Sequence, residues 1–112
     1  MTRGSDRPRL YVRFAESDPA AAEQRLAQMS AHKAHLRNED GVPEGFRILA
    51  SGPMQAESGG SAAALIIAEA RCIEDIMAFS DADPFVIHGV YNRIRILNWT
   101  PTLSRISGLE GD

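Results

Sequence analysis

Four separate stretches of the chain have hydrophobic patterns that predict strands. In the first and the last, residues alternate with a period of two, which is typical of strands that have two unlike faces. The first stretch covers residues 9–15, and the others cover residues 46–54, 62–71 and 89–99. The third stretch is the most apolar run in the chain, which predicts a central strand. The second and third strands are expected to form an antiparallel hairpin with a long connection.

Two helical segments are predicted between these strands. Asp18 can cap a helix that begins at Pro19, because proline suits the first helical position. Residues with high helix propensity continue this helix to about Leu36, where the turn cluster DGVPEG ends it. A second helix begins at Ile73, where apolar residues recur at helical spacing. Pro84 then opens a further short helical turn before the last strand.

The order strand, helix, strand, strand, helix, strand predicts a ferredoxin-like βαββαβ unit. Such an α+β fold has an antiparallel sheet with both helices on one face. We find no internal repeat and no linker, so residues 1–112 are interpreted as a single domain. Residues 1–8 are predicted to be a flexible arm, and residues 100–112 a loosely ordered tail.

Composition and charge exclude several classes of protein. The chain has 112 residues and a net charge of −3, which gives no indication of nucleic-acid binding. No apolar run reaches the roughly 18 residues that a transmembrane helix needs, so no membrane partner is expected. The polar N-terminus is not typical of a secretory signal, and a cytoplasmic location is therefore expected. Cys72 is the sole cysteine, which excludes an intrachain disulfide and a cysteine-based metal site.

The first and last predicted strands have two unlike faces. One face mixes aromatic residues with arginines, and it holds Tyr11, Arg13, Arg93, Arg95 and Trp99. Aromatic and arginine side chains are enriched at protein interfaces, so we predict a homodimer formed through this open sheet face. A plain solvated face is the alternative. The arginines also favour a small, anionic metabolite as a ligand. The opposite, aliphatic face is expected to contact the helices, and its residues are Leu10, Val12, Phe14, Val90, Ile94 and Ile96.

His32 lies at the edge of the apolar face of the first predicted helix. An imidazole in that position needs a hydrogen-bond partner, whether it is structural or functional. His32 and His35 could also form a metal pair, with Asp83 or His88 as a third ligand. Other acids and cysteines at ligand spacing are absent from this helix, so no metal and no cofactor are expected.

Asp83 directly precedes Pro84, which is the usual order of an N-cap and a first helical residue. This structural role does not exclude a second one, because a carboxylate has two oxygens with several lone pairs. One oxygen can cap backbone N–H groups while the carboxylate also accepts a hydrogen bond from an imidazole. Such a carboxylate fixes the histidine tautomer and stabilises the imidazolium ion.

Three motifs occur in a recognisable order: AHKAHL, ASGPM and DADPFVIHGVY. With these motifs, residues 9–99 resemble the YciI-like (YCII) family. The resemblance implies a ferredoxin-like fold that dimerises sheet to sheet into a dimeric α/β barrel. It also implies a histidine and an aspartate that meet in a small cleft, at the positions of His32 and Asp83.

One departure concerns the residues before the histidine. Many relatives have an Arg-Pro pair there, whereas this chain has Met29 and Ser30. Arg25 is a candidate to replace the missing arginine in binding an anionic substrate. The SGPM segment is interpreted either as a tight turn or as a loop that lines the cleft. The expected substrate-binding residues are therefore Arg25, Ser51, Gly52, Pro53, Met54 and Phe85.

The leading hypothesis is a small enzyme in which His32 moves a proton and Asp83 orients the imidazole. The expected reaction is a proton abstraction, a lyase-type elimination or a hydrolysis on a small, anionic or phenolic metabolite. The family resemblance includes a branch of chlorinated-hydroquinone dehydrochlorinases. The alternative is a non-catalytic module in which the same cleft binds or senses a small molecule.

Overall fold

The computed structural model describes residues 7–38 and 40–109. Within these ranges the chain forms four strands, three α-helices and one 3-10 helix. Most of the predicted N-terminal arm lies outside the described residues. The elements are β1 (Arg9–Ser17), η1 (Pro19–Ala21), α1 (Ala22–Arg37), β2 (Arg47–Gln55), β3 (Ser61–Ala70), α2 (Ile73–Asp81), α3 (Pro84–Ile87) and β4 (Tyr91–Trp99).

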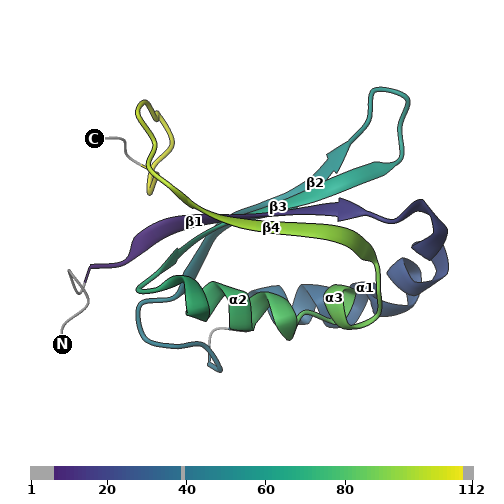
Figure 1. Ribbon diagram of the computed structural model, residues 1–112, viewed down its shortest axis with the longest axis horizontal. Coiled ribbons are helices and arrows are strands. Elements are labelled where there is room, and N and C mark those ends of the chain that lie inside the picture. Colours follow the sequence, from purple (N-terminus) through teal and green to yellow (C-terminus); the bar gives the residue numbers. More distant parts are fainter. Residues whose placement is uncertain (1–6, 39, 110–112) are drawn as a thin grey trace.

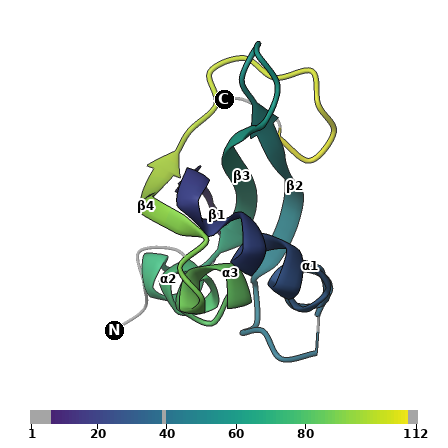
Figure 2. The ribbon, with the colours of Figure 1, turned by 90° about the vertical axis from the view of Figure 1, so that its right-hand side faces the viewer.

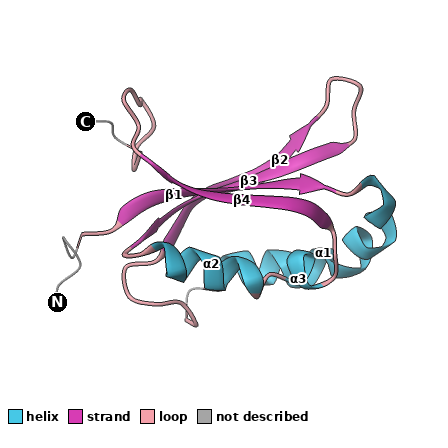
Figure 3. Cartoon of the chain, viewed as in Figure 1, coloured by secondary structure: helices cyan, strands magenta, loops and turns pink. Residues whose placement is uncertain are grey.

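The four strands form one antiparallel sheet in the order β2-β3-β1-β4. Among the residues that the structure describes, all the helices lie on one face of this sheet and none covers the other face (Figures 1 and 3). The predicted α+β, ferredoxin-like fold is therefore confirmed. No helix in the described ranges is both long and apolar enough to cross a membrane.

Two hydrophobic clusters join the helices to the sheet. The first contains Tyr11, Ile66 and Ala68 from the sheet and Ile76 and Phe79 from α2. The second lies near the C-terminal end of β1, and its buried residues are Ala15, Phe85, Val90 and Tyr91. The aromatic residues of the second cluster form one side of the candidate site described below.

The prediction for the two faces of β1 was wrong. Tyr11 and Arg13 are 2% and 1% exposed, and they lie on the face that the helices cover. Leu10, Val12 and Phe14 lie on the open face, because successive side chains of a strand point to opposite sides. Both faces of β1 carry apolar side chains, so alternation predicted the strand without showing which face is buried.

In β4 the predicted faces are correct for most of the strand. Ile94 and Ile96 pack against the two helix-facing clusters, and Arg93, Arg95 and Trp99 lie on the open face. The homodimer through this face stays a prediction, and it no longer includes Tyr11 or Arg13.

The described part of the C-terminal tail, residues 100–109, lies on the side of the sheet opposite the helices (Figures 1 and 2). It contains no helix and no strand. Pro101 and Leu109 are nevertheless buried. The mobility expected for this tail stays a prediction.

Candidate active site

Asp83 lies between α2 and α3 and caps the start of α3. Its Oδ1 atom accepts a hydrogen bond from the backbone N–H of Phe85 at 2.9 Å, and Pro84 occupies the first turn. The predicted N-cap is therefore confirmed. The side chain is fully buried, which is unusual for a carboxylate and requires compensating partners.

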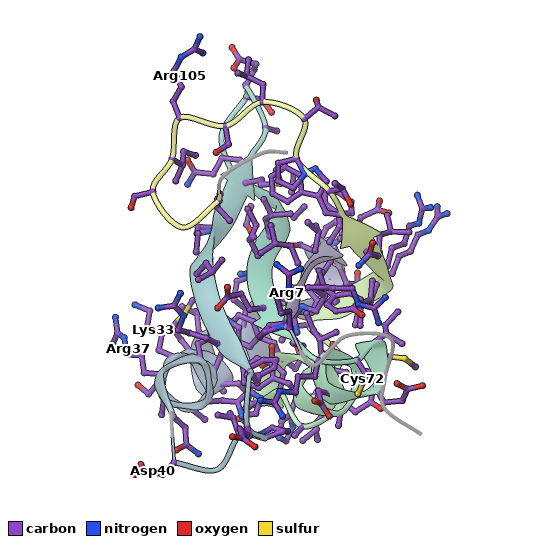
Figure 4. All side chains as sticks on the ribbon, turned by 90° about the vertical axis from the view of Figure 1, so that its left-hand side faces the viewer. Arg7, Lys33, Arg37, Asp40, Cys72 and Arg105 are labelled. Atoms are coloured by element: carbon purple, nitrogen blue, oxygen red, sulfur yellow. The ribbon has the colours of Figure 1, made fainter. Side chains whose placement is uncertain are left out.

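His32 supplies the first of these partners from α1. Its Nδ1 atom lies 2.7 Å from Asp83 Oδ1, across 51 residues of sequence. An ionised carboxylate only accepts, so the Nδ1–H group donates and the lone pair of the neutral ring lies on Nε2. His32 is the one buried residue of α1, all of which is described. The same helix directs Lys33 and Arg37 away from the rest of the molecule (Figure 4).

Arg13 supplies the second partner from β1. Its Nη1 atom donates to Asp83 Oδ2 at 2.9 Å and to Ser80 Oγ at 3.2 Å. Sequence reasoning missed this contact because it placed Arg13 on the open face. The sequence did offer one signal. Arg13 lies two residues from both Tyr11 and Ala15, so the three side chains share one face of β1.

These contacts determine the charge of Asp83. Burial by itself raises the pKa of this carboxyl group. The hydrogen bonds from His32 and the Phe85 amide, together with the charges of His32 and Arg13, outweigh burial and hold its pKa below the ordinary value. Asp83 is therefore ionised at neutral pH, as an orienting carboxylate must be.

Phe85 forms an aromatic wall beside this pair. Its ring stacks on His32 with centroids 3.9 Å apart and an interplanar angle of 2°. Arg25 Cζ also lies over the Phe85 ring, 5.2 Å from its centroid. His32 and Arg25 are seven residues apart on one helix face, about 10.5 Å along the axis, which leaves room for one ring between them. Arg25 Nη2 donates to Ser17 Oγ at 2.6 Å.

Tyr91 closes the site on the β4 side and was not predicted as a site residue. Its ring meets Phe85 edge-on at 5.7 Å, and Arg13 Cζ lies over it at 5.2 Å. A register shift explains its inward direction, because Ser17 pairs with Tyr91 while Glu16 pairs with Arg93. Such a bulge turns a side chain to the other face of the sheet.

The SGPM segment is neither a turn nor a loop. Residues 51–54 lie inside β2, an edge strand, and pair with β3. Gly52 and Met54 pair with Leu65 and Ala63, which places them on the open face and away from His32. Proline is tolerated at position 53 because an edge strand has N–H groups that need no strand partner. Ser51 and Pro53 pair with Ile66 and Ala64 on the helix side of the sheet, and the substrate-binding role expected for residues 51–54 stays a prediction.

The alternative metal pair on α1 does not converge. His35 Nε2 donates to the backbone carbonyl of Phe79 at 2.8 Å, and its ring stacks on Phe79. His88 is exposed on the surface. Among the described residues, no three histidine, cysteine, aspartate or glutamate side chains are grouped so that they could hold a metal ion.

Comparison with known proteins places the chain in a family. The YCII-related domain matches residues 9–100. Protein YciI of Escherichia coli and that of Shigella flexneri are each 34% identical over 95 residues, covering 78% of this chain and 92% of the relative.

A solved structure shares the fold at lower identity. It is the 5-chloro-2-hydroxyhydroquinone dehydrochlorinase of Burkholderia phenoliruptrix in complex with 2,5-dihydroxybenzoquinone. The TM-score is 0.69 and the identity 21%, with 81% of this chain and 93% of that chain covered. The fold is thus common to both. The YCII-related domain matches most of the chain, and the YciI relatives are 34% identical to it. The chain therefore belongs to the YCII-related family of YciI-like proteins.

Proposed function

We propose that the chain is a small enzyme that uses His32 as a general base and acid, with Asp83 as the group that orients and charges the imidazole. The observation that carries the proposal is the 2.7 Å contact between His32 Nδ1 and the buried, ionised carboxylate of Asp83. A carboxylate in this position holds the Nδ1–H tautomer and directs the lone pair of Nε2 outward.

The first step assigned to His32 is the removal of a proton from the substrate. Nε2 takes the proton, and the ring becomes an imidazolium ion that Asp83 stabilises through the Nδ1–H bond. His32 keeps 11% of its side chain exposed, whereas Asp83 is fully covered. The imidazole is therefore the member of the pair that can meet a substrate.

The proposed reaction class is an elimination. The electron pair released by proton removal forms a new double bond in the substrate, and a leaving group departs with its own bonding pair. His32 then returns its proton to the leaving group or to water, which restores the enzyme. The dehydrochlorinase with the same fold performs a reaction of this class, which supports elimination over hydrolysis.

A turnover screen tests the proposal. Small chlorinated hydroquinones and related phenols are incubated with the protein, and release of chloride and loss of ultraviolet absorbance are followed. His32→Asn should lower the rate by about 10² or more, the usual contribution of general acid–base catalysis. His88→Asn is the matched control, since His88 is exposed on the surface, and it should leave the rate unchanged.

Two outcomes of this screen contradict the proposal. Turnover at the wild-type rate in His32→Asn would show that the imidazole takes no part in the reaction. Binding of these compounds, detected by thermal shift without turnover of any of them, would favour the non-catalytic sensing module instead.

We also propose that the chain is a homodimer through the open sheet face. Large apolar side chains are exposed there, including Leu97 at 49% and Trp99 at 37%. Val12 and Phe14 continue this apolar strip onto β1, and Arg93 and Arg95 border it. A second copy of the same face would remove the strip from water, which is the main contribution to association.

A further inference from the structure

The described part of the chain holds four buried side-chain nitrogen or oxygen atoms that have no hydrogen-bond partner, and three of them lie beside the His32–Asp83 pair. They are Arg13 Nε, Arg13 Nη2 and the hydroxyl oxygen of Tyr91. Buried polar groups are nearly always paired, so such a concentration requires an explanation. The remaining atom, Arg71 Nε, belongs to the other end of the domain, near Glu44.

The free atoms of Arg13 have a defined geometry. Nη1 is already held by Asp83 and Ser80, which fixes the plane of the guanidinium group. The unpaired Nε–H and one N–H of Nη2 point in parallel from one side of the guanidinium group. With this pair of donors arginine forms a bidentate contact with a carboxylate or phosphate. A ligand at this edge must therefore offer acceptor oxygens.

Tyr91 extends the same donor edge. Burial, with the charge of Asp83, raises the pKa of its hydroxyl, while the charges of Arg13 and Arg25 and the polar contact with Arg13 act in the opposite direction, so both guanidinium groups lie close to it. The hydroxyl oxygen is buried without a hydrogen-bond partner. Its O–H group remains protonated at neutral pH and can donate to a bound ligand, because arginine offers donors but no acceptor.

The charges of the cluster favour an anion over water. Arg13 and Arg25 contribute two positive charges, and Asp83 contributes one negative charge. Arg25 is bound to a neutral hydroxyl, and among the ion pairs of the described residues it has no carboxylate partner. Water could satisfy the donors but not the excess positive charge, whereas one anionic group would satisfy both.

We propose that Arg13 Nε, Arg13 Nη2 and the Tyr91 hydroxyl form a subsite for an anionic oxygen of a small planar substrate, a phenolate or a carboxylate. This proposal rests on the proposed function, because it places that oxygen beside the base His32. The aromatic rings of His32, Phe85 and Tyr91, which border the site, suit a planar molecule. Arg25 is only half-buried, whereas His32, Phe85 and Tyr91 are buried, so we place the entrance for the ligand beside Arg25.

Binding of three probes tests the subsite without any need for turnover. They are 4-nitrophenolate, 4-nitrobenzoate and the uncharged nitrobenzene, and their dissociation constants are measured by absorbance or calorimetry. The wild type should bind at least one of the anions about tenfold or more tightly than nitrobenzene, because hydrogen bonds to charged groups are the strong ones. The anion that binds more tightly identifies the source of the oxygen.

Tyr91→Phe is the decisive variant, since it removes one oxygen and keeps the ring. It should weaken binding of the preferred anion about tenfold and leave nitrobenzene unaffected. Tyr11→Phe is the matched control, because Tyr11 is buried on the same face of the sheet but packs in the other cluster. It should change neither constant. Arg13→Lys keeps the charge but lacks the side-on donors, and it should weaken the anion further if circular dichroism shows that it folds.

The inference is overturned if nitrobenzene binds as tightly as both anions, if none of the probes binds at millimolar concentration, or if Tyr91→Phe binds the anion like the wild type. Its failure is separable from that of the proposed function. His32→Asn should retain anion binding, so a working subsite without turnover contradicts only the chemistry. Turnover that requires His32 but is indifferent to Tyr91→Phe contradicts only the subsite.

Discussion

Asp83→Asn isolates the charge of the buried carboxylate while keeping its size. Asparagine is also a good N-cap, so the contact with the Phe85 amide is largely retained. The ionic contact with Arg13 and the bond from His32 Nδ1 lose their charged acceptor. The guanidinium group then lies 1% exposed with no counter-charge among its described partners.

The expected cost follows from these contacts. Removing one partner of a buried ion pair typically costs about 3–5 kcal/mol, because the other charge remains buried. We therefore expect Asp83→Asn to lower the free energy of unfolding by about 3 kcal/mol at pH 7. Asp83→Ala should lose about 1 kcal/mol more, since it also removes the cap of α3.

The same variant has a characteristic pH dependence. The folded-state pKa of Asp83 lies below its ordinary value of 3.8, so its stabilising effect is fully present above that value. The effect is lost as the pH falls through the depressed pKa, where the folded state must also take up the proton. The part of the stability difference between wild type and Asp83→Asn that comes from the Asp83 charge should therefore shrink as the pH falls below 3.8.

Urea unfolding followed by circular dichroism measures this difference at each pH. Asp81→Asn is the matched control, because Asp81 is an exposed carboxylate only two residues upstream. It should change the stability by no more than about 0.5 kcal/mol. A loss below about 1 kcal/mol for Asp83→Asn, or a loss equal to that of Asp81→Asn, would refute the reasoning from the buried pair.

Two further predictions concern other parts of the molecule. Burial raises the pKa of Tyr91 above 10.0, so the wild type should lose stability relative to Tyr91→Phe as the pH rises through and beyond 10.0. A stability difference between the two proteins that stays constant at alkaline pH would contradict this. Light scattering should report a dimer for the wild type and a monomer for Val12→Asp on the open face. Leu26→Asp, which alters an exposed residue of α1, should remain dimeric, and a monomeric wild type would rule out the proposed interface.

The sequence predicted the strand and helix order because each element carries its own periodicity and its own cap. The prediction that His32 contacts Asp83 came from the resemblance to the family motifs, and the Asp-Pro cap supported it. Periodicity alone did not bring them together. Arg13 was missed for a physical reason, since a strand period gives two faces but does not say which one is covered.

The error at residues 51–54 has a different origin. Gly-Pro is a strong turn signal, yet Gly52 and Pro53 continue β2 as an edge strand. Backbone pairing with β3 outweighs the local preference for a turn there. The bulge that turns Tyr91 inward likewise depends on the pairing of β1 with β4. No local feature of the sequence around residue 91 indicates it.

The central claim is that Asp83 holds His32 in the Nδ1–H tautomer, which leaves Nε2 free to accept a proton. The direct measurement is the pair of ring ¹⁵N chemical shifts of His32, recorded at a pH where the ring is neutral and assigned with His32→Asn. We expect a protonated Nδ1 and an unprotonated Nε2 in the wild type, with this preference weakened in Asp83→Asn. A neutral ring protonated on Nε2 in the wild type would contradict it.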